Sequence, residues 1–84
     1  MKHKVAQFMK FKIYMDHDDE NCPNPHVYVD FHGLRGTYDF KKKEWRFCEL
    51  EGLDKWAVES FVEDYEPYFY ENYNENAYAW INGD

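Results

Sequence analysis

The spacing of apolar residues changes once along this chain, near Gly52, and this change constrains the fold more than any other feature. Up to Cys48, apolar and polar residues alternate with a period of two, which is typical of half-buried strands. Pro23 and Pro25 lie in a polar loop that separates the first alternating segment from the second. The pattern predicts a four-stranded antiparallel meander over about residues 7–48, with strands near residues 8–14, 26–32, 37–40 and 44–48.

After Gly52 the apolar residues follow helical spacing. Asp54 is the predicted N-cap of a helix whose apolar positions continue to Tyr65. Pro67 cannot lie inside a helix without a kink, so we expect it to begin a second, shorter helix. Residues 75–84 form a tail without a periodic pattern. The sequence therefore predicts one α+β domain, residues 1–84, whose two C-terminal helices (residues 54–74) pack on one face of the sheet.

Charge is distributed unevenly along the chain. The net charge is −7 and the pI is near 4.9, which argues against a free-standing nucleic-acid-binding protein. Residues 1–48 carry nine basic and seven acidic residues, whereas residues 49–84 carry ten acidic residues and only Lys55. Aromatic residues make up 21% of the chain, more than so small a core needs, so several are expected at the surface. The predicted helical half is therefore acidic and rich in rings.

One stretch resembles a small bacterial family of unknown function, often encoded in loci that look like toxin–antitoxin modules. The resemblance rests on Phe11-Lys12-Ile13-Tyr14, Asp16-His17 and Pro23-Asn24-Pro25-His26-Val27-Tyr28-Val29. Members of the family carry an aromatic-x-Ile-Tyr strand, a Pro-Pro-His-x-His-Val segment, a glycine-bounded hairpin and two helices. In this chain Tyr28 replaces the second histidine, Asn24 separates the two prolines and the acidic loop is longer. The resemblance implies the same order of elements over roughly residues 8–74.

His26 and His32 are the candidate catalytic residues. Both fall on the predicted outward face of the second strand, beside Tyr28 and Asp30, and histidine can exchange protons near neutral pH. A neighbouring arginine, Arg35 or Arg46, would then hold a phosphate, as in a small ribonuclease-like toxin. In the alternative interpretation the face is an ordinary solvated one, and His26 fixes the proline loop by a hydrogen bond to a carbonyl.

Metal and cofactor chemistry is not predicted. Cys22 and His26 have the spacing of half a metal site, and Cys48 is the only other cysteine. A strong signal for a metal site would be four ligands at fixed spacing, which this sequence does not show. Both thiols are expected to be free. The first twelve residues lack the continuous apolar stretch of a leader peptide, and no run is long enough to span a membrane. We therefore expect a cytoplasmic protein with no cofactor and no membrane partner.

An acidic stripe on the helices is the remaining candidate site. Glu59, Glu63 and Glu66 are spaced to share one helix face, where like charges repel and the single lysine of the predicted helices, Lys55, lies before all three. Interleaved tyrosines are residues favoured at interfaces. The predicted partner-binding residues are Glu59, Glu63, Asp64, Glu66, Tyr68, Tyr70 and Glu71.

Two functional hypotheses follow from these sites. The first is a non-enzymatic acidic module that inhibits a basic nucleic-acid-handling protein by partial nucleic-acid mimicry, without binding nucleic acid itself. The partner would be a nuclease or a CRISPR effector subunit, and the module an antitoxin-like protein or a phage anti-CRISPR-type inhibitor. The second hypothesis is the ribonuclease-like toxin that uses His26 and His32. One alternative to the first hypothesis stays open, in which the acidic residues serve only to keep the protein soluble.

Overall fold

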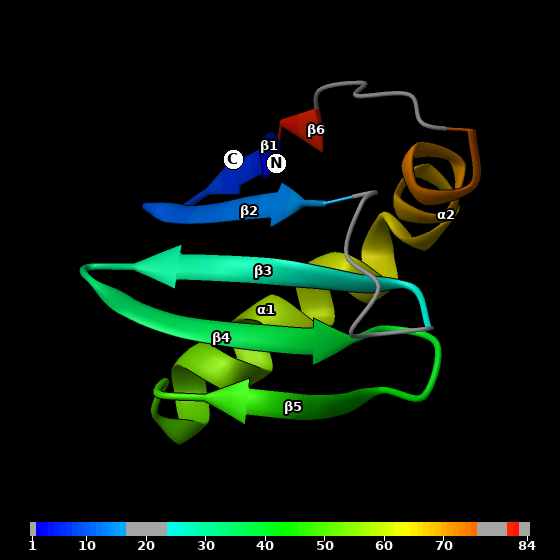
Figure 1. The fold of residues 1–84 in the computed structure, drawn as a ribbon. Helices are drawn as coiled ribbons and strands as arrows, with labels where there is room; N and C mark the ends of the chain where they lie inside the picture. Colours follow the sequence, from blue (N-terminus) through cyan, green and yellow to red (C-terminus); the bar gives the residue numbers. More distant parts are fainter. Residues whose placement is uncertain (1, 17–23, 76–80, 83–84) are drawn as a thin grey trace.

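The computed structural model describes residues 2–16, 24–75 and 81–82. Five antiparallel strands follow one another in chain order and two helices follow the strands, so the predicted α+β class and the meander are confirmed (Figure 1). A two-residue strand then pairs in parallel with the first strand, so the sheet order is β5-β4-β3-β2-β1-β6. The elements are β1 (His3–Phe8), β2 (Phe11–Met15), β3 (His26–Phe31), β4 (Leu34–Asp39), β5 (Glu44–Cys48), α1 (Gly52–Asp64), α2 (Glu66–Glu75) and β6 (Ile81–Asn82).

The prediction of four strands is wrong, because the expected strand at residues 8–14 runs through the turn of the β1–β2 hairpin and leaves out all of β1 except Phe8. Met9 and Lys10 form this turn, with φ angles of 44° and 71°. Such turns are normally marked by Asn-Gly or Asp-Gly, since both central residues need a positive φ. Here neither residue carries that signal. Phe8 and Phe11 both reach the core and stack with ring centroids 4.8 Å apart, whereas Met9 is 68% exposed.

The core fills the space between the sheet and α1, which crosses behind the strands in Figure 1. Aromatic stacking ties the two layers together: the Phe8 ring lies 4.0 Å from that of Phe61 on α1. On the sheet, Phe11 stacks on Phe31 at the same distance. The two helices separate at Tyr65, just before Pro67, as predicted. Whereas α1 lies on one sheet face as expected, α2 lies at the end of the sheet where β2 ends and β3 begins (Figure 1).

The beginning of α1 differs from the prediction. Glu51 holds the N-cap position and makes no side-chain capping hydrogen bond, whereas Asp54 lies inside the first turn. A carboxylate in the first turn still interacts favourably with the helix dipole. The predicted N-cap at Asp54 is therefore wrong by three residues, and the helix begins at Gly52.

Asp39 organises the basic turn between β4 and β5. Its side chain is buried, with 2% exposed, and one carboxylate oxygen accepts the backbone N–H groups of Lys41 and Lys42 at 3.0 and 2.9 Å. The other oxygen accepts a hydrogen bond from the Asn24 side chain at 3.0 Å. These contacts satisfy the buried carboxylate and join the β4–β5 turn to the segment before β3.

The strand register aligns two rows of side chains on the sheet face opposite α1, which we call the open face. The first row crosses all five antiparallel strands through Lys4, Tyr14, Tyr28, Thr37 and Phe47. The second row crosses four strands through Gln7, Lys12, Asp30 and Arg35. Because side chains alternate between the faces of a strand, both rows lie on the same side of the sheet.

Candidate functional site

Three residues of the predicted acidic stripe line a small crevice between the helices and the sheet. Glu59 and Glu63 come from α1 and Glu66 is the first residue of α2. The crevice has a volume of about 120 Å³, and its other lining residues are Tyr38, Phe40, Lys43 and Val62. The structure thus brings the three carboxylates together and adds a lysine from the β4–β5 turn, which reasoning from the helix alone had not placed there.

Glu59 differs from the other two because it has a partner in the sheet. The indole Nε1–H of Trp45 donates a hydrogen bond to a carboxylate oxygen of Glu59 at 2.7 Å. A hydrogen bond to a charged group is among the stronger ones, so it holds β5 to α1. The Glu59 carboxylate is therefore engaged within the fold, while Glu63 is exposed.

Tyr38 reports on the electrostatics of this crevice. Burial of its hydroxyl, followed by the negative charges of Glu59 and Glu63, raises the pKa of Tyr38 to about 12. Asp39 and Glu66 contribute in the same direction. Each of these effects disfavours the tyrosinate, because an anion would be removed from water and placed among other anions. The hydroxyl of Tyr38 is therefore a neutral group in the crevice at physiological pH.

The other predicted partner-binding residues divide between surface and core. Asp64, Glu71 and Tyr68 are exposed, with 55% of the Tyr68 side chain accessible. Tyr70 instead packs edge-on against Phe40, with ring centroids 5.0 Å apart, and burial followed by the charge of Glu66 raises its pKa. Much of the Tyr70 ring thus belongs to the core, and Tyr68 is the more accessible ring of α2.

Sequence reasoning missed two apolar side chains on α1. Leu53 is 83% exposed and Trp56 is 65% exposed, although Trp56 is one of the apolar residues that follow helical spacing after Gly52. Together with Ser60, Glu63 and Asp64 they fall at spacings of three and four residues, which is one face of a helix. The acidic outer face of α1 therefore carries an apolar end. One signal in the sequence indicates this apolar end: at helical spacing, Trp56 falls on the opposite face from Val58, Phe61 and Val62, which are buried.

The structure separates the two histidines of the enzyme hypothesis. His26 begins β3 and His32 follows its end, so they lie about 20 Å apart at roughly 3.3 Å per residue. His26 is buried, with 2% exposed, and its ring donates the Nδ1–H to the carbonyl oxygen of Asn24 at 2.7 Å. His32 is exposed in a turn with a φ angle of 52°. His26 lies on the same face of β3 as Tyr28 and Asp30, but it is buried there and fixes the proline loop. His32 lies beyond the end of the strand, so no common substrate atom lies within reach of both rings.

Metal-ligating side chains do not gather in the part of the chain that the structure describes, where no group of three or more His, Cys, Asp or Glu residues forms. Cys48 is a free thiol that accepts a hydrogen bond from the backbone N–H of Leu50 at 3.3 Å. The predicted half-site residue Cys22 lies outside the described residues. Within those residues, neither helix has the length and apolar character needed to cross a bilayer.

Comparisons with known proteins assign no family to this fold. No protein-family model matches the chain, and no curated protein or solved structure matches it at a significant level. The resemblance to the bacterial family of toxin–antitoxin-like loci therefore stays a prediction. Function has to be argued from the surface chemistry of this chain alone.

Proposed function

We propose that this protein is a non-enzymatic module that binds a basic protein partner through the outer surface of its two helices. The observation that carries the proposal is an exposed tryptophan on a helix face that also carries two exposed carboxylates, about two turns away. Trp56 and Leu53 project from α1 on the face that also carries Glu63 and Asp64. Large exposed apolar side chains within a charged surface are typical of protein interaction sites.

Each part of this surface has a distinct role in the proposal. Trp56 is the anchor, because burying an exposed indole in a partner removes much apolar area from water. The carboxylates set the sign of the partner and accelerate the encounter, since opposite charges attract before contact. Tyr68 extends the surface onto α2 with a ring that has both an apolar body and a hydroxyl.

The favoured class of partner is a protein whose own surface binds nucleic acid, such as a nuclease or a CRISPR effector subunit. Such proteins present cationic grooves that attract phosphates, and an acidic surface with rings competes for the same groove. An antitoxin-like protein and a phage anti-CRISPR-type inhibitor are both consistent with this surface. The separation of His26 from His32 gives the ribonuclease hypothesis no comparable support.

The test compares two variants with a control of matched charge. Affinity capture identifies a partner of the wild type, and binding of that purified partner is then measured by calorimetry. We expect Trp56→Ala to weaken binding by about 30-fold, equivalent to roughly 2 kcal/mol at an interface anchor. Charge reversal at Glu63 and Asp64 is expected to slow association and reduce its salt dependence. Glu59 is left unchanged, because its carboxylate is bonded to Trp45 and its loss would disturb the fold.

Glu44→Lys is the control, because Glu44 is exposed on β5 and lies outside the helical surface. It introduces the same change of charge per residue as either helical reversal. Equal weakening by Glu44→Lys and by the helical reversals would indicate a dependence on net charge only. Salt-insensitive binding, or binding that survives Trp56→Ala unchanged, would contradict the proposal.

A further inference from the structure

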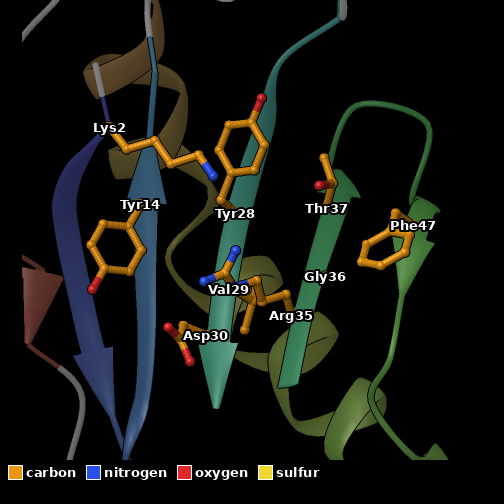
Figure 2. A pocket seen from close by; sticks show the side chains of 9 residues that line it. All are labelled: Lys2, Tyr14, Tyr28, Val29, Asp30, Arg35, Gly36, Thr37 and Phe47. Atoms are coloured by element: carbon orange, nitrogen blue, oxygen red, sulfur yellow. The ribbon is translucent and has the colours of Figure 1, made fainter. Parts of the chain in front are cut away.

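The open face of the sheet carries a second set of side chains with a different chemistry. Two adjoining hollows, of about 370 and 480 Å³, lie on this face and share Asp30 as a lining residue. The larger is lined by Gln7, Lys10, Lys12, Asp30, His32 and Gly33. The side chains that line the smaller, shown in Figure 2, include Lys2, Tyr14, Tyr28, Asp30, Arg35 and Phe47. Together they form one track across the strands.

Aromatic rings are spaced along this track by the strand register. Tyr14, Tyr28 and Phe47 occupy one cross-strand row, on β2, β3 and β5. Phe47 is 54% exposed, although it has no polar atom to satisfy in water. The ammonium group of Lys2 lies 4.2 Å from the centre of the Tyr28 ring, and Figure 2 shows this side chain reaching across β2. The track therefore combines accessible rings with a cation already held against one of them.

Positive charge dominates the lining of both hollows. Lys2, Lys10, Lys12 and Arg35 face one carboxylate, that of Asp30. Arg35 is exposed and lies on the strand next to Asp30, with its guanidinium beside Tyr28 in Figure 2. The lining thus has an excess of three positive charges, in contrast to the acidic helices on the other side of the sheet.

We propose that the open face binds a short single strand of nucleic acid. Single-strand binding sites pair a cationic groove, which follows the phosphates, with aromatic side chains on which bases stack. The row of Tyr14, Tyr28 and Phe47 supplies the rings, and Lys10, Lys12 and Arg35 supply the exposed cations. Two adjoining hollows favour a strand over a single nucleotide, because the cations extend past the hollow that holds the rings.

This inference revises the expectation that the chain makes no direct contact with nucleic acid. That expectation came from the net charge of −7, which averages over the whole chain. In the fold, the net-positive residues 1–48 build the five antiparallel strands and the acidic residues lie mainly on the helices. At physiological ionic strength charges are screened beyond about 8 Å, so the opposite layer weakens binding on the open face without preventing it.

The experiment measures fluorescence anisotropy of a labelled oligonucleotide of about ten residues, as RNA and as DNA of equivalent sequence. With three phosphate-contacting cations, the affinity is expected to fall about 20-fold between roughly 50 and 200 mM salt. Arg35→Gln is expected to reduce the slope of log affinity against log salt by about 0.7. Phe47→Leu, which removes the ring but keeps an apolar side chain, is expected to weaken binding about tenfold, and Phe47→Tyr to preserve it.

Lys41→Gln is the matched control for Arg35→Gln, because Lys41 is exposed in the β4–β5 turn outside both hollows. It removes one positive charge and is expected to leave the salt dependence unchanged. Binding of either the RNA or the DNA supports the proposal and identifies the preferred sugar. Absence of binding at low salt overturns it, as does equal weakening by Lys41→Gln. Salt-sensitive self-association that Arg35→Gln abolishes, without oligonucleotide binding, would assign the face to a second copy and overturn it as well.

Discussion

Alkaline pH is expected to destabilise this protein through Tyr38, whose pKa rises from 10.0 to about 12 on folding. Because the folded state holds the proton more tightly, its stabilisation is complete below pH 10 and is lost as the pH rises to about 12. Two pKa units represent roughly 3 kcal/mol. The crevice beside the hydroxyl opens to solvent, so screening reduces our expected loss to about 2 kcal/mol.

Tyr38→Phe isolates this contribution from the other tyrosines, because it removes the titrating hydroxyl and keeps the ring in the core. The assay is urea unfolding followed by far-ultraviolet circular dichroism at several pH values between 9 and about 12. Relative to Tyr38→Phe, the wild type should lose about 2 kcal/mol of stability over this range, because only the wild type forms the disfavoured tyrosinate at this position. Tyr68→Phe is the control for the loss of a tyrosine hydroxyl, since Tyr68 is exposed and lies outside the crevice.

If the wild type and Tyr38→Phe lose stability in parallel, the reasoning is refuted, because Tyr38 would then have the same pKa in the folded and the unfolded state. A second measurement tests the cause of the shift. Glu63→Gln removes one of the charges that raise the pKa of Tyr38, so the tyrosinate absorbance should appear at lower pH in that variant. An unchanged titration would mean that Glu63 does not approach the hydroxyl.

Three further changes test the fold. Asp39→Ala should lower the free energy of unfolding by about 3 kcal/mol, since it leaves three part-buried donors without their acceptor. Lys41→Ala should change it by less than about 0.5 kcal/mol in the same urea assay. Gly36→Ala should lower the free energy of unfolding by about 1–3 kcal/mol and shift the tryptophan emission, because the added Cβ would lie 2.6 Å from the Trp45 ring. An unchanged spectrum would show that the Trp45 ring does not lie against Gly36. Lys10→Gly should raise the thermal midpoint and increase the free energy of unfolding by about 0.5–1 kcal/mol, because Lys10 has a φ angle of 71°, which favours glycine. A lower midpoint would contradict the positive φ angle at this turn.

The sequence predicts the class of this fold because side-chain periodicity follows directly from strand and helix geometry. The alternation up to Cys48 and the helical spacing after Gly52 each correspond to the observed elements. Local turn chemistry was the weaker signal. The Met9-Lys10 turn adopts positive φ angles without glycine or asparagine, so the alternating pattern predicts one strand through the turn and does not indicate β1.

The candidate sites were predictable only where one element supplies them. Helical spacing alone brings Glu59 and Glu63 together. Their neighbours Tyr38, Lys43 and Trp45 come from the sheet, and no local pattern indicates which strands α1 will cross. The aromatic and cationic rows of the open face depend on strand register, which is set by long-range pairing and by the turn that the sequence did not reveal.

The strand β5 lies at one edge of the sheet and presents backbone groups that an incoming strand could pair with. The pairing of β4 with β5 shifts between Thr37 and Tyr38, so Arg46 has no partner on β4. Such a bulge twists and bends an edge strand, and a charged residue at that point discourages further pairing. The irregular edge therefore protects the protein against growth into cross-β aggregates, even though Phe47 next to Arg46 is exposed.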